Sequence, residues 1–156
     1  MIKPLHGTSI EEYNEVINTN LFSSFYLLST FAKRMKNGSA LFFSSVAASL
    51  GLSNHEVISA AKSGIEGFVR SSAATYSKDN LRVNAIAPSI MDSNMSKKIL
   101  STEQAVEISK SMHPIPKIGT YDDILPVVRW LMSDDAEWVT GQTINIDGGL
   151  SKIKPR

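Results

Sequence analysis

Apolar residues recur at three- and four-residue spacing near the start of the chain, a pattern typical of an amphipathic helix. The resulting broad apolar stripe consists of Ile10, Tyr13, Ile17, Leu21, Phe25 and Leu28. Ser9 and Glu12 have the spacing of a capping box, so the helix is expected to begin after Ser9. It is expected to end near residues 33–36, where Asn37 and Gly38 follow and Gly38 can take the left-handed conformation.

Three short apolar runs predict strands, and the first is consistent with a strand that is buried on both faces. They are residues 40–45, 81–87 and 143–147. The second run stops at Pro88, which cannot donate to a strand ladder. Small and apolar residues at helical spacing predict a second long helix over residues 56–76. Thr120 is placed to cap a further helix that runs through Met132.

The alternation of these helices and strands predicts an α/β fold with a doubly wound parallel sheet and right-handed crossovers. Residues 93–108 are expected to hold one or two short helices, with Ser101 as a possible cap. No internal repeat or linker is visible, and 156 residues suffice for one domain. We therefore expect residues 1–156 to form a single domain.

Composition and charge narrow the functional classes. Hydrophobic residues make up 42% and charged residues 20%, which favours a packed protein over a disordered one. The net charge of +1 is too small an excess of positive charge to indicate binding to nucleic acid or to an anionic membrane, and we expect neither as a partner. The absence of cysteine excludes disulfides, thiolate metal sites and cysteine nucleophiles, and suits a reducing cytoplasm. His6 and His113 lack metal-ligand spacing, so no metal site is expected.

Five segments occur in the order and at the spacings of one known family. They are residues 16–21, 43–47, 59–64, 82–88 and 138–149. Together they resemble the short-chain dehydrogenase/reductase family. The resemblance implies a partial Rossmann-type fold, with the three C-terminal strands of the sheet and their flanking helices. It also implies hydride transfer between NAD or NADP and a small carbonyl or alcohol substrate.

The same resemblance implies roles for three residues at the active site. Ser45 matches the family's catalytic Ser, whose hydroxyl binds the substrate oxygen. Lys62 matches the active-site Lys, which holds the nicotinamide ribose and lowers the pKa of a neighbouring Tyr. Asn20 matches the Asn that holds a water molecule linked to this Lys. The end of a parallel strand, where Ser45 is expected, is also where such sheets place ligand-contacting groups.

The resemblance further implies a cofactor-binding loop after the second strand. Besides Lys62, the residues expected to meet the cofactor are Pro88, Met91 and Ser93. Ser89 stands where the family usually has Gly. If that position requires a positive φ, Ser89 is expected to be strained.

Two departures from the family pattern bear on function. The glycine-rich turn that seats the pyrophosphate is absent from this sequence, so NAD or NADP is expected to bind only when that half is supplied. Ile58 stands four residues before Lys62, where the family has its proton-donating Tyr. His55, three residues before Ile58, is a candidate base, because a helix N-terminus favours neutral imidazole. The other interpretation of His55 is a cap or a solvated loop residue.

Three hypotheses therefore stay open. The chain is an oxidoreductase of this family with an altered proton donor, or a catalytically silent relative that binds a partner, or a truncated gene product. The strand at residues 40–45 is expected to have an unpaired apolar edge. The two long helices carry apolar faces through which we expect a homo-oligomer to form.

Overall fold

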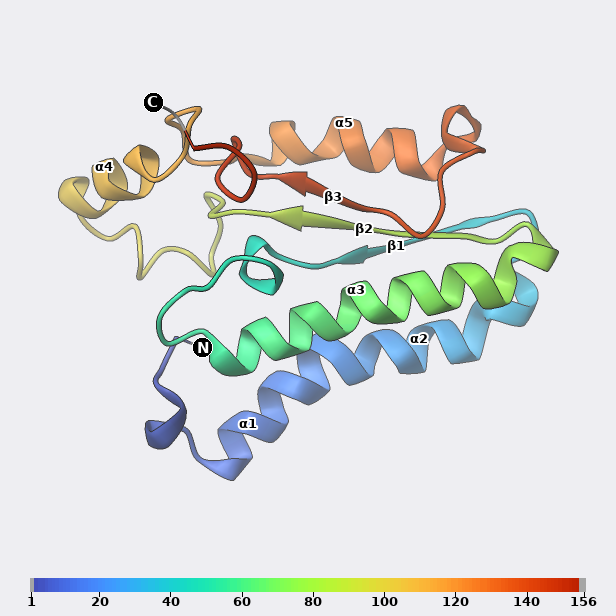
Figure 1. Ribbon diagram of the computed structural model, residues 1–156, viewed down its shortest axis with the longest axis horizontal. Coiled ribbons are helices and arrows are strands. Elements are labelled where there is room, and N and C mark those ends of the chain that lie inside the picture. The colour runs from blue at the N-terminus through green and yellow to red at the C-terminus, as the bar shows by residue number, and fades with distance from the viewer. Residues whose placement is uncertain (1, 155–156) are drawn as a thin grey trace.

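The computed structural model describes residues 2–154 and is built around a three-stranded parallel sheet (Figure 1). The strands are β1 (Ser39–Phe43), β2 (Arg82–Pro88) and β3 (Thr143–Ile146), adjacent in that order. Ala40 pairs with Val83 on one side of β2, and Ile144 pairs with Ile86 on the other. The predicted α/β class and parallel sheet are confirmed, with strand bounds that differ from prediction by one or two residues.

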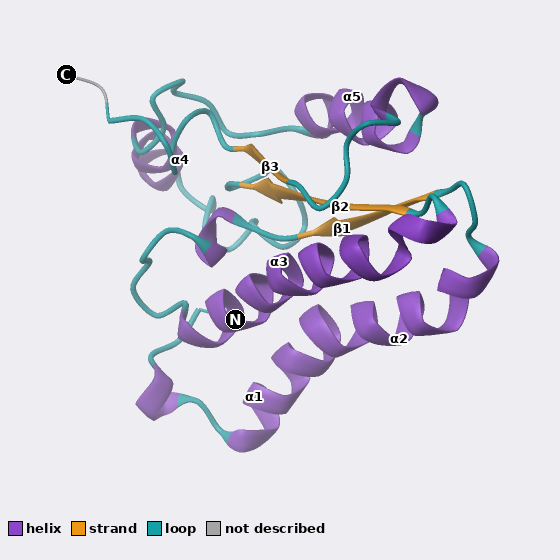
Figure 2. Cartoon of the chain, turned by 45° about the vertical axis from the view of Figure 1, so that its right-hand side comes forward, coloured by secondary structure: helices purple, strands orange, loops and turns teal. Residues whose placement is uncertain are grey.

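Helices cover both faces of the sheet (Figures 1 and 2). They are α1 (Ile10–Ile17), α2 (Ser23–Phe31), α3 (Glu56–Tyr76), α4 (Glu103–Ser111) and α5 (Tyr121–Met132). Helix α3 lies against one face, with α1 and α2 outside it, and α5 lies against the other face. The predicted bounds of α3 and α5 are confirmed. Helix α4 begins later than expected, because Thr102 rather than Ser101 accepts the hydrogen bond that caps it, from the Ala105 N–H at 3.1 Å.

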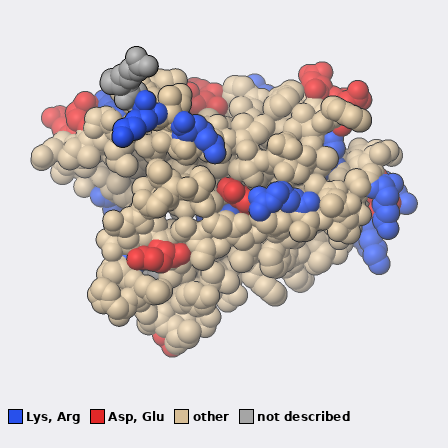
Figure 3. Space-filling model, in the orientation of Figure 1, with Lys and Arg blue, Asp and Glu red and all other residues tan. Residues whose placement is uncertain are grey.

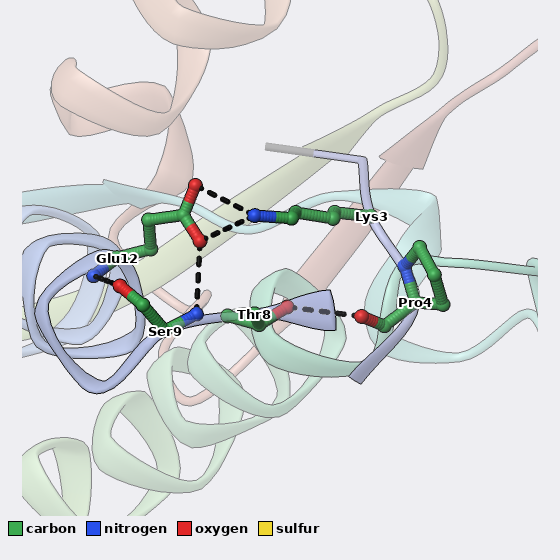
Figure 4. Close-up of polar contacts among 5 residues, drawn as sticks. All are labelled: Lys3, Pro4, Thr8, Ser9 and Glu12. Atoms are coloured by element: carbon green, nitrogen blue, oxygen red, sulfur yellow. Dashed lines mark hydrogen bonds and ion pairs between the residues drawn. The ribbon is translucent and has the colours of Figure 1, made fainter. Parts of the chain in front are cut away.

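The first helix begins at the predicted capping box (Figure 4). The Glu12 N–H donates to Ser9 Oγ at 3.3 Å, and the Ser9 N–H donates to Glu12 Oε2 at 2.9 Å. Lys3 Nζ lies 2.7 Å from the same carboxylate, and Thr8 Oγ1 donates to the Pro4 carbonyl at 3.1 Å. The bonds from Lys3 and from the Ser9 N–H lower the pKa of Glu12. The entry to α1 is thus fixed by local polar contacts.

The predicted single long helix is interrupted by a π-helical turn at Asn18–Phe22. Such a turn accommodates one additional residue. Leu28 is twelve residues after Val16, but the additional residue leaves about eleven ordinary helical rotations of about 100° between them. The two side chains therefore leave the helix in directions that differ by only about 20°. Val16 and Leu28 are accordingly buried, whereas Ile10, part of the predicted stripe, is 64% exposed. Within the predicted stripe, Leu28 is therefore part of the core and Leu21 packs against it, whereas Ile10, Tyr13 and Phe25 are exposed.

The turn after α2 also differs from the prediction. Asn37, not Gly38, takes the left-handed conformation, with φ 54°. Gly38 is needed for another reason, since an added Cβ would lie 3.0 Å from the Met35 carbonyl oxygen. Asn80 is left-handed as well and donates to the Asn37 side chain at 3.1 Å. This pair joins the turns that precede β1 and β2.

The core has two parts, one on each face of β2. Val83 and Ala85 pack with Ile65 and Val69 of α3, whereas Ile86 packs against α5. Helices α3 and α5 therefore lie on opposite faces, although the strands advance across the sheet in one direction. The two crossovers must then have opposite hands, so the expectation that both are right-handed was wrong. The long connection from β2 to β3 contains α4 and α5, and its helix α5 covers the second face.

On the face in Figure 3, acidic and basic side chains are scattered between broad uncharged areas. Within residues 2–154, no helix is long and apolar enough to cross a membrane. The same residues contain no group of three or more His, Asp or Glu side chains that could hold a metal ion.

Asp123 caps α5 and provides a test of the fold. Its carboxylate accepts from Lys117 Nζ at 2.5 Å and from the Thr120 N–H and hydroxyl at 2.8 and 2.9 Å. These bonds, that of Lys117 foremost, lower the pKa of Asp123 from 3.8 to about 2. The stabilisation is therefore fully present above the unfolded-state value and is lost as the pH falls toward about 2.

We expect Asp123→Asn to lower the free energy of unfolding by about 1 kcal/mol at pH 7, because the charged cap is lost. The difference from wild type should shrink between pH 4 and pH 2, as measured by urea unfolding. Asp122→Asn, at an exposed residue of the same helical turn, is the control. A difference that stays constant across this pH range would contradict the proposed cap.

Candidate active site

The candidate site lies at the edge of the sheet where all three parallel strands end (Figure 1). The loops at this edge carry Ser45 after β1, the segment from Ser89 to Ser93 after β2, and Gly148 after β3. Open parallel sheets bind ligands outside the carboxyl ends of their strands. The fold thus brings the predicted Ser45 and cofactor loop to one side of the molecule.

Ser45 lies two residues beyond the end of β1 and is half-buried. Its backbone is extended, and it forms the N-cap of a 3₁₀ turn at Val46–Ala48. Ser45 Oγ accepts the Ala47 N–H at 3.2 Å. This bond uses an oxygen lone pair and orients the side chain, so the hydroxyl hydrogen can donate to a ligand oxygen.

Lys62 projects from α3 to the end of β1. Its Nζ donates to the Phe43 carbonyl oxygen at 2.9 Å. Because Phe43 is two residues before Ser45, the ammonium lies at the strand end that carries Ser45. Burial lowers the pKa of Lys62. One of the three N–H groups is used by Phe43, and the other two can donate to hydroxyls of a bound molecule.

Two residues that the sequence did not single out support this arrangement. Ser44 is buried, and its hydroxyl donates to Glu66 Oε1 at 2.9 Å. Ser63 Oγ donates to the Ala48 carbonyl at 2.9 Å. With Lys62, these contacts fasten the end of β1 to α3 on both sides of Ser45. The available signal was the position of Glu66, one helical turn beyond Lys62.

Asn20 lies inside the π-helical turn and donates from Nδ2 to the Val16 carbonyl at 3.0 Å. This turn packs closely on α3, because a Cβ added to Gly64 would lie 2.9 Å from the methyl groups of Leu21. Asn20 is thus on an element adjacent to the Lys62 region of α3. Among the described residues, the side chains of Asn20, Ser45 and Lys62 each bond to backbone groups and not to one another.

His55 is placed apart from these groups. It is the N-cap residue of α3, and its Nδ1 lies 2.8 Å from the Ser53 carbonyl oxygen. No hydrogen bond in the described part of the chain joins it to Ser45 or Lys62. Ile58, at the position of the family's Tyr, is half-buried and has no group that can transfer a proton.

The predicted cofactor loop leaves the sheet after Pro88, the last residue of β2. Ser89 is not among the described non-glycine residues with positive φ, so the condition under which strain was expected is not met. Its N–H continues the ladder by donating to the Ile146 carbonyl at 3.2 Å. A Ser at this position is therefore compatible with ordinary strand geometry.

Farther along the loop, Met91 forms a bridge with Gly119. A Cβ on Gly119 would lie 2.5 Å from Met91 Sδ and 3.3 Å from the Ile90 carbonyl oxygen, so a larger residue would displace the Met91 side chain. The Ser93 N–H donates to Ser96 Oγ at 3.1 Å, and the Ser96 hydroxyl donates to the Met91 carbonyl. Ser96, which the sequence analysis missed, therefore closes the loop on itself.

The described residues are better suited to the nicotinamide side of a dinucleotide than to its pyrophosphate. The Lys62 ammonium and the loop from Pro88 to Ser93 supply polar groups at the sheet edge. The described glycines with positive φ, Gly141, Gly148 and Gly149, all border β3, and none opens a helix after a strand. The described residues therefore supply no pyrophosphate-binding turn.

Parallel strands, helices on both faces and polar residues at the strand ends define the C-terminal part of a Rossmann-type α/β protein. A family model described as enoyl-(acyl carrier protein) reductase matches residues 1–151. The chain belongs to the short-chain dehydrogenase/reductase family.

Several characterised or solved proteins are similar to this chain. A tropinone reductase homolog from Arabidopsis thaliana is 32% identical over 96% of the chain and 47% of its own length. The 3-oxoacyl-[acyl-carrier-protein] reductase FabG of Thermotoga maritima is 34% identical over 90% of the chain and 57% of its own length. The structure of a 4-hydroxyisoleucine dehydrogenase complexed with NADH superposes on this chain with a TM-score of 0.93 at 27% identity. The superposition covers 98% of this chain and 65% of the dehydrogenase. The chain thus spans about half the length of the curated relatives that it matches.

The pKa of Lys62 gives a test of its buried placement. Because burial lowers this pKa below 10.5, the folded protein loses the proton at a lower pH than the unfolded chain does. The cost of burying the charge acts fully below the folded-state pKa and is relieved as the pH rises toward 10.5.

The free energy of unfolding of wild type, minus that of Lys62→Met, is therefore expected to increase between pH 7 and pH 10.5. Urea unfolding at several pH values measures this difference. Lys33→Met, at an exposed lysine, is the control for loss of one positive charge. An unchanged difference across the range would show that the Lys62 ammonium is solvated.

Proposed function

We propose that this chain forms the substrate and nicotinamide side of an NAD(P)-dependent oxidoreductase that acts on a small carbonyl or alcohol. The observation that carries the proposal is the contact of Lys62 Nζ with the Phe43 carbonyl at 2.9 Å, beside Ser45. It sets an ammonium and a hydroxyl at the same strand end. We place the activity in the cytoplasm, because a chain without cysteine suits a reducing compartment.

The proposed roles follow from the chemistry of each group. Ser45 donates its hydroxyl hydrogen to the substrate oxygen, where negative charge develops during reduction. The Lys62 ammonium adds positive potential and binds ribose hydroxyls, while Asn20 holds a water molecule near it. Since Ile58 cannot supply a proton, protonation of the substrate oxygen is the impaired step. His55 is the remaining titratable candidate on the same helix, although its ring is bonded to Ser53.

NAD or NADP is the proposed cofactor, and when bound it supplies or accepts the hydride. Lys62, Pro88, Met91 and Ser93 would hold its nicotinamide half. The pyrophosphate half requires a glycine-rich turn that residues 2–154 do not contain. We therefore propose that the cofactor binds when a family N-terminal half pairs with the free edge of β1.

A second candidate function is a catalytically silent module that binds a partner or a second copy. Ile58 favours it, because this position lies one helical turn from Lys62 and carries no ionisable group. The retained Ser45 and Lys62 count against it. The two functions differ in whether nucleotide binds once the phosphate half is present.

A chimera tests the proposal by joining the N-terminal part of the Thermotoga maritima FabG that precedes the matched segment to this chain. We expect NADH or NADPH to raise its melting temperature, because a ligand that binds only the folded state stabilises it. Ile58→Tyr in the chimera should increase reduction of a 3-oxoester at least about a hundredfold, as expected for a restored general acid.

Ile58→Phe is the matched control, since it adds the ring without the hydroxyl. Lys62→Met in the Ile58→Tyr chimera should abolish the gain. A folded chimera that melts at the same temperature with and without nucleotide would favour the silent module.

We also propose that the chain forms a homo-oligomer through the outer face of α2. Tyr26, Leu27 and Phe31 of α2 are exposed, as is Phe22 at the end of the π-helical turn before it, and Tyr26 is 66% exposed. Phe22 and Tyr26 are four residues apart, as are Leu27 and Phe31, so each pair lies one helical turn apart on the same side. Helix α2 lies on the outer side of α3 (Figure 2), and such exposed apolar side chains are typical of an interaction surface.

Tyr26→Asp is expected to reduce the molecular mass in solution to that of a monomer, as measured by size-exclusion chromatography with light scattering. A carboxylate buried in an apolar interface is costly, which is the reason for the effect. Tyr121→Asp, at an equally exposed tyrosine on α5, is the matched control. Wild-type protein that is already monomeric at high concentration would rule the interface out.

A further inference from the structure

His113 is a buried histidine that the proposed chemistry does not use. It lies two residues beyond the end of α4 and is 6% exposed. Its Nδ1 is 2.7 Å from the Ser109 carbonyl oxygen, and its Nε2 is 2.7 Å from Ser89 Oγ. A carbonyl oxygen only accepts, so Nδ1 carries the hydrogen and Nε2 of the neutral ring accepts from the Ser89 hydroxyl.

The imidazole therefore bridges α4 and the loop after β2. Helix α4 has little other support, because Ser109 is its only buried residue. In Figures 1 and 2 it stands at the end of the sheet, apart from α3 and α5. The carbonyl that accepts the hydrogen bond from His113 Nδ1 is that of Ser109, the one buried residue of α4.

The other end of the bridge is anchored in the sheet. Ser89 follows β2 directly, and its N–H donates to the Ile146 carbonyl of β3. Two residues later, the backbone on either side of Met91 is bonded to Gly119. The Asp92 N–H donates to the Gly119 carbonyl at 2.8 Å, and the Gly119 N–H donates to the Ile90 carbonyl at 3.1 Å. The loop is thus held on one side by backbone and on the other by the side chain of His113.

A cavity of about 280 Å³ adjoins the bridge and is lined by Ser89, Met91, His113, Asp147 and Gly148, among others. Two of these walls are the bridged side chains themselves. The cavity gives the loop and the His113 ring space in which to shift when the bridge is absent, since no packed side chain fills it.

We infer that the bridge from Ser89 through His113 to Ser109 positions both α4 and the loop 89–93, and that His113 is a positioning residue for the nicotinamide side of the site. The second part rests on the proposed function. The first part stands on the bridge alone and can be tested without nucleotide.

The experiment is hydrogen exchange of the whole chain, read by mass spectrometry in the absence of nucleotide. Ser89→Ala is expected to accelerate exchange of peptides covering the loop and α4 roughly fivefold to tenfold, because a buried acceptor loses its donor. Peptides from α3 and β2 should be unaffected. Ser89→Thr keeps the hydroxyl and should restore wild-type exchange in α4.

Nitrogen NMR of the His113 ring supplies a signature that general destabilisation would not change. We expect the hydrogen on Nδ1 in wild type and in Ser89→Thr, with a shifted Nε2 resonance in Ser89→Ala. Ser111→Ala is the matched control, since its exposed hydroxyl donates at 2.8 Å only to Ile108 of its own helix.

Unchanged α4 exchange in Ser89→Ala, equal acceleration in Ser111→Ala, or a hydrogen on Nε2 would overturn the inference. Because no nucleotide is present, failure of the proposed cofactor site does not affect this readout. A confirmed bridge in a protein whose chimera binds no nucleotide would overturn the proposed function and leave α4 positioning in place.

Discussion

Strand β2 is buried on both faces, and the arrangement of the whole chain depends on that burial. Val83, Ala85 and Ile86 are inaccessible to solvent, with α3 on one side and α5 on the other. Asn84 is equally buried, and its side chain donates to the Val139 carbonyl at 2.9 Å and accepts the Gln142 N–H at 3.0 Å. A buried amide must be paired in this way, and the pairing sets the path of the chain into β3.

The candidate site follows from the same constraint. Once β2 is central, the ends of β1 and β2 lie side by side, and Ser45 and the loop after Pro88 share one edge. Helix α3 then reaches this edge through Lys62 and Glu66, which bond to the Phe43 carbonyl and the Ser44 hydroxyl. The site is therefore positioned by contacts between β1 and α3 that also contribute to packing.

The candidate site holds one charged group and lacks another. The Lys62 ammonium reaches the end of β1 at the Phe43 carbonyl, whereas Ile58, four residues earlier on α3, carries no group that can transfer a proton. The outer edge of β1 is unpaired within residues 2–154, and Phe43 at its end is half exposed.

Local pattern was sufficient to predict the helices that begin at Ser9 and Thr120, the three strands and their parallel class, because caps and periodicity act within a few residues. The resemblance placed Ser45 and Lys62 at a strand end and on α3, and the structure brings both to one edge. The sequence could not show the π-helical turn that buries Val16 or the opposite hands of the crossovers. It could not show the Ser89–His113 bond either, whose partners are 24 residues apart. These features were decided by tertiary packing, because a side chain finds a distant partner only after burial of the two faces of β2 has fixed where each segment lies.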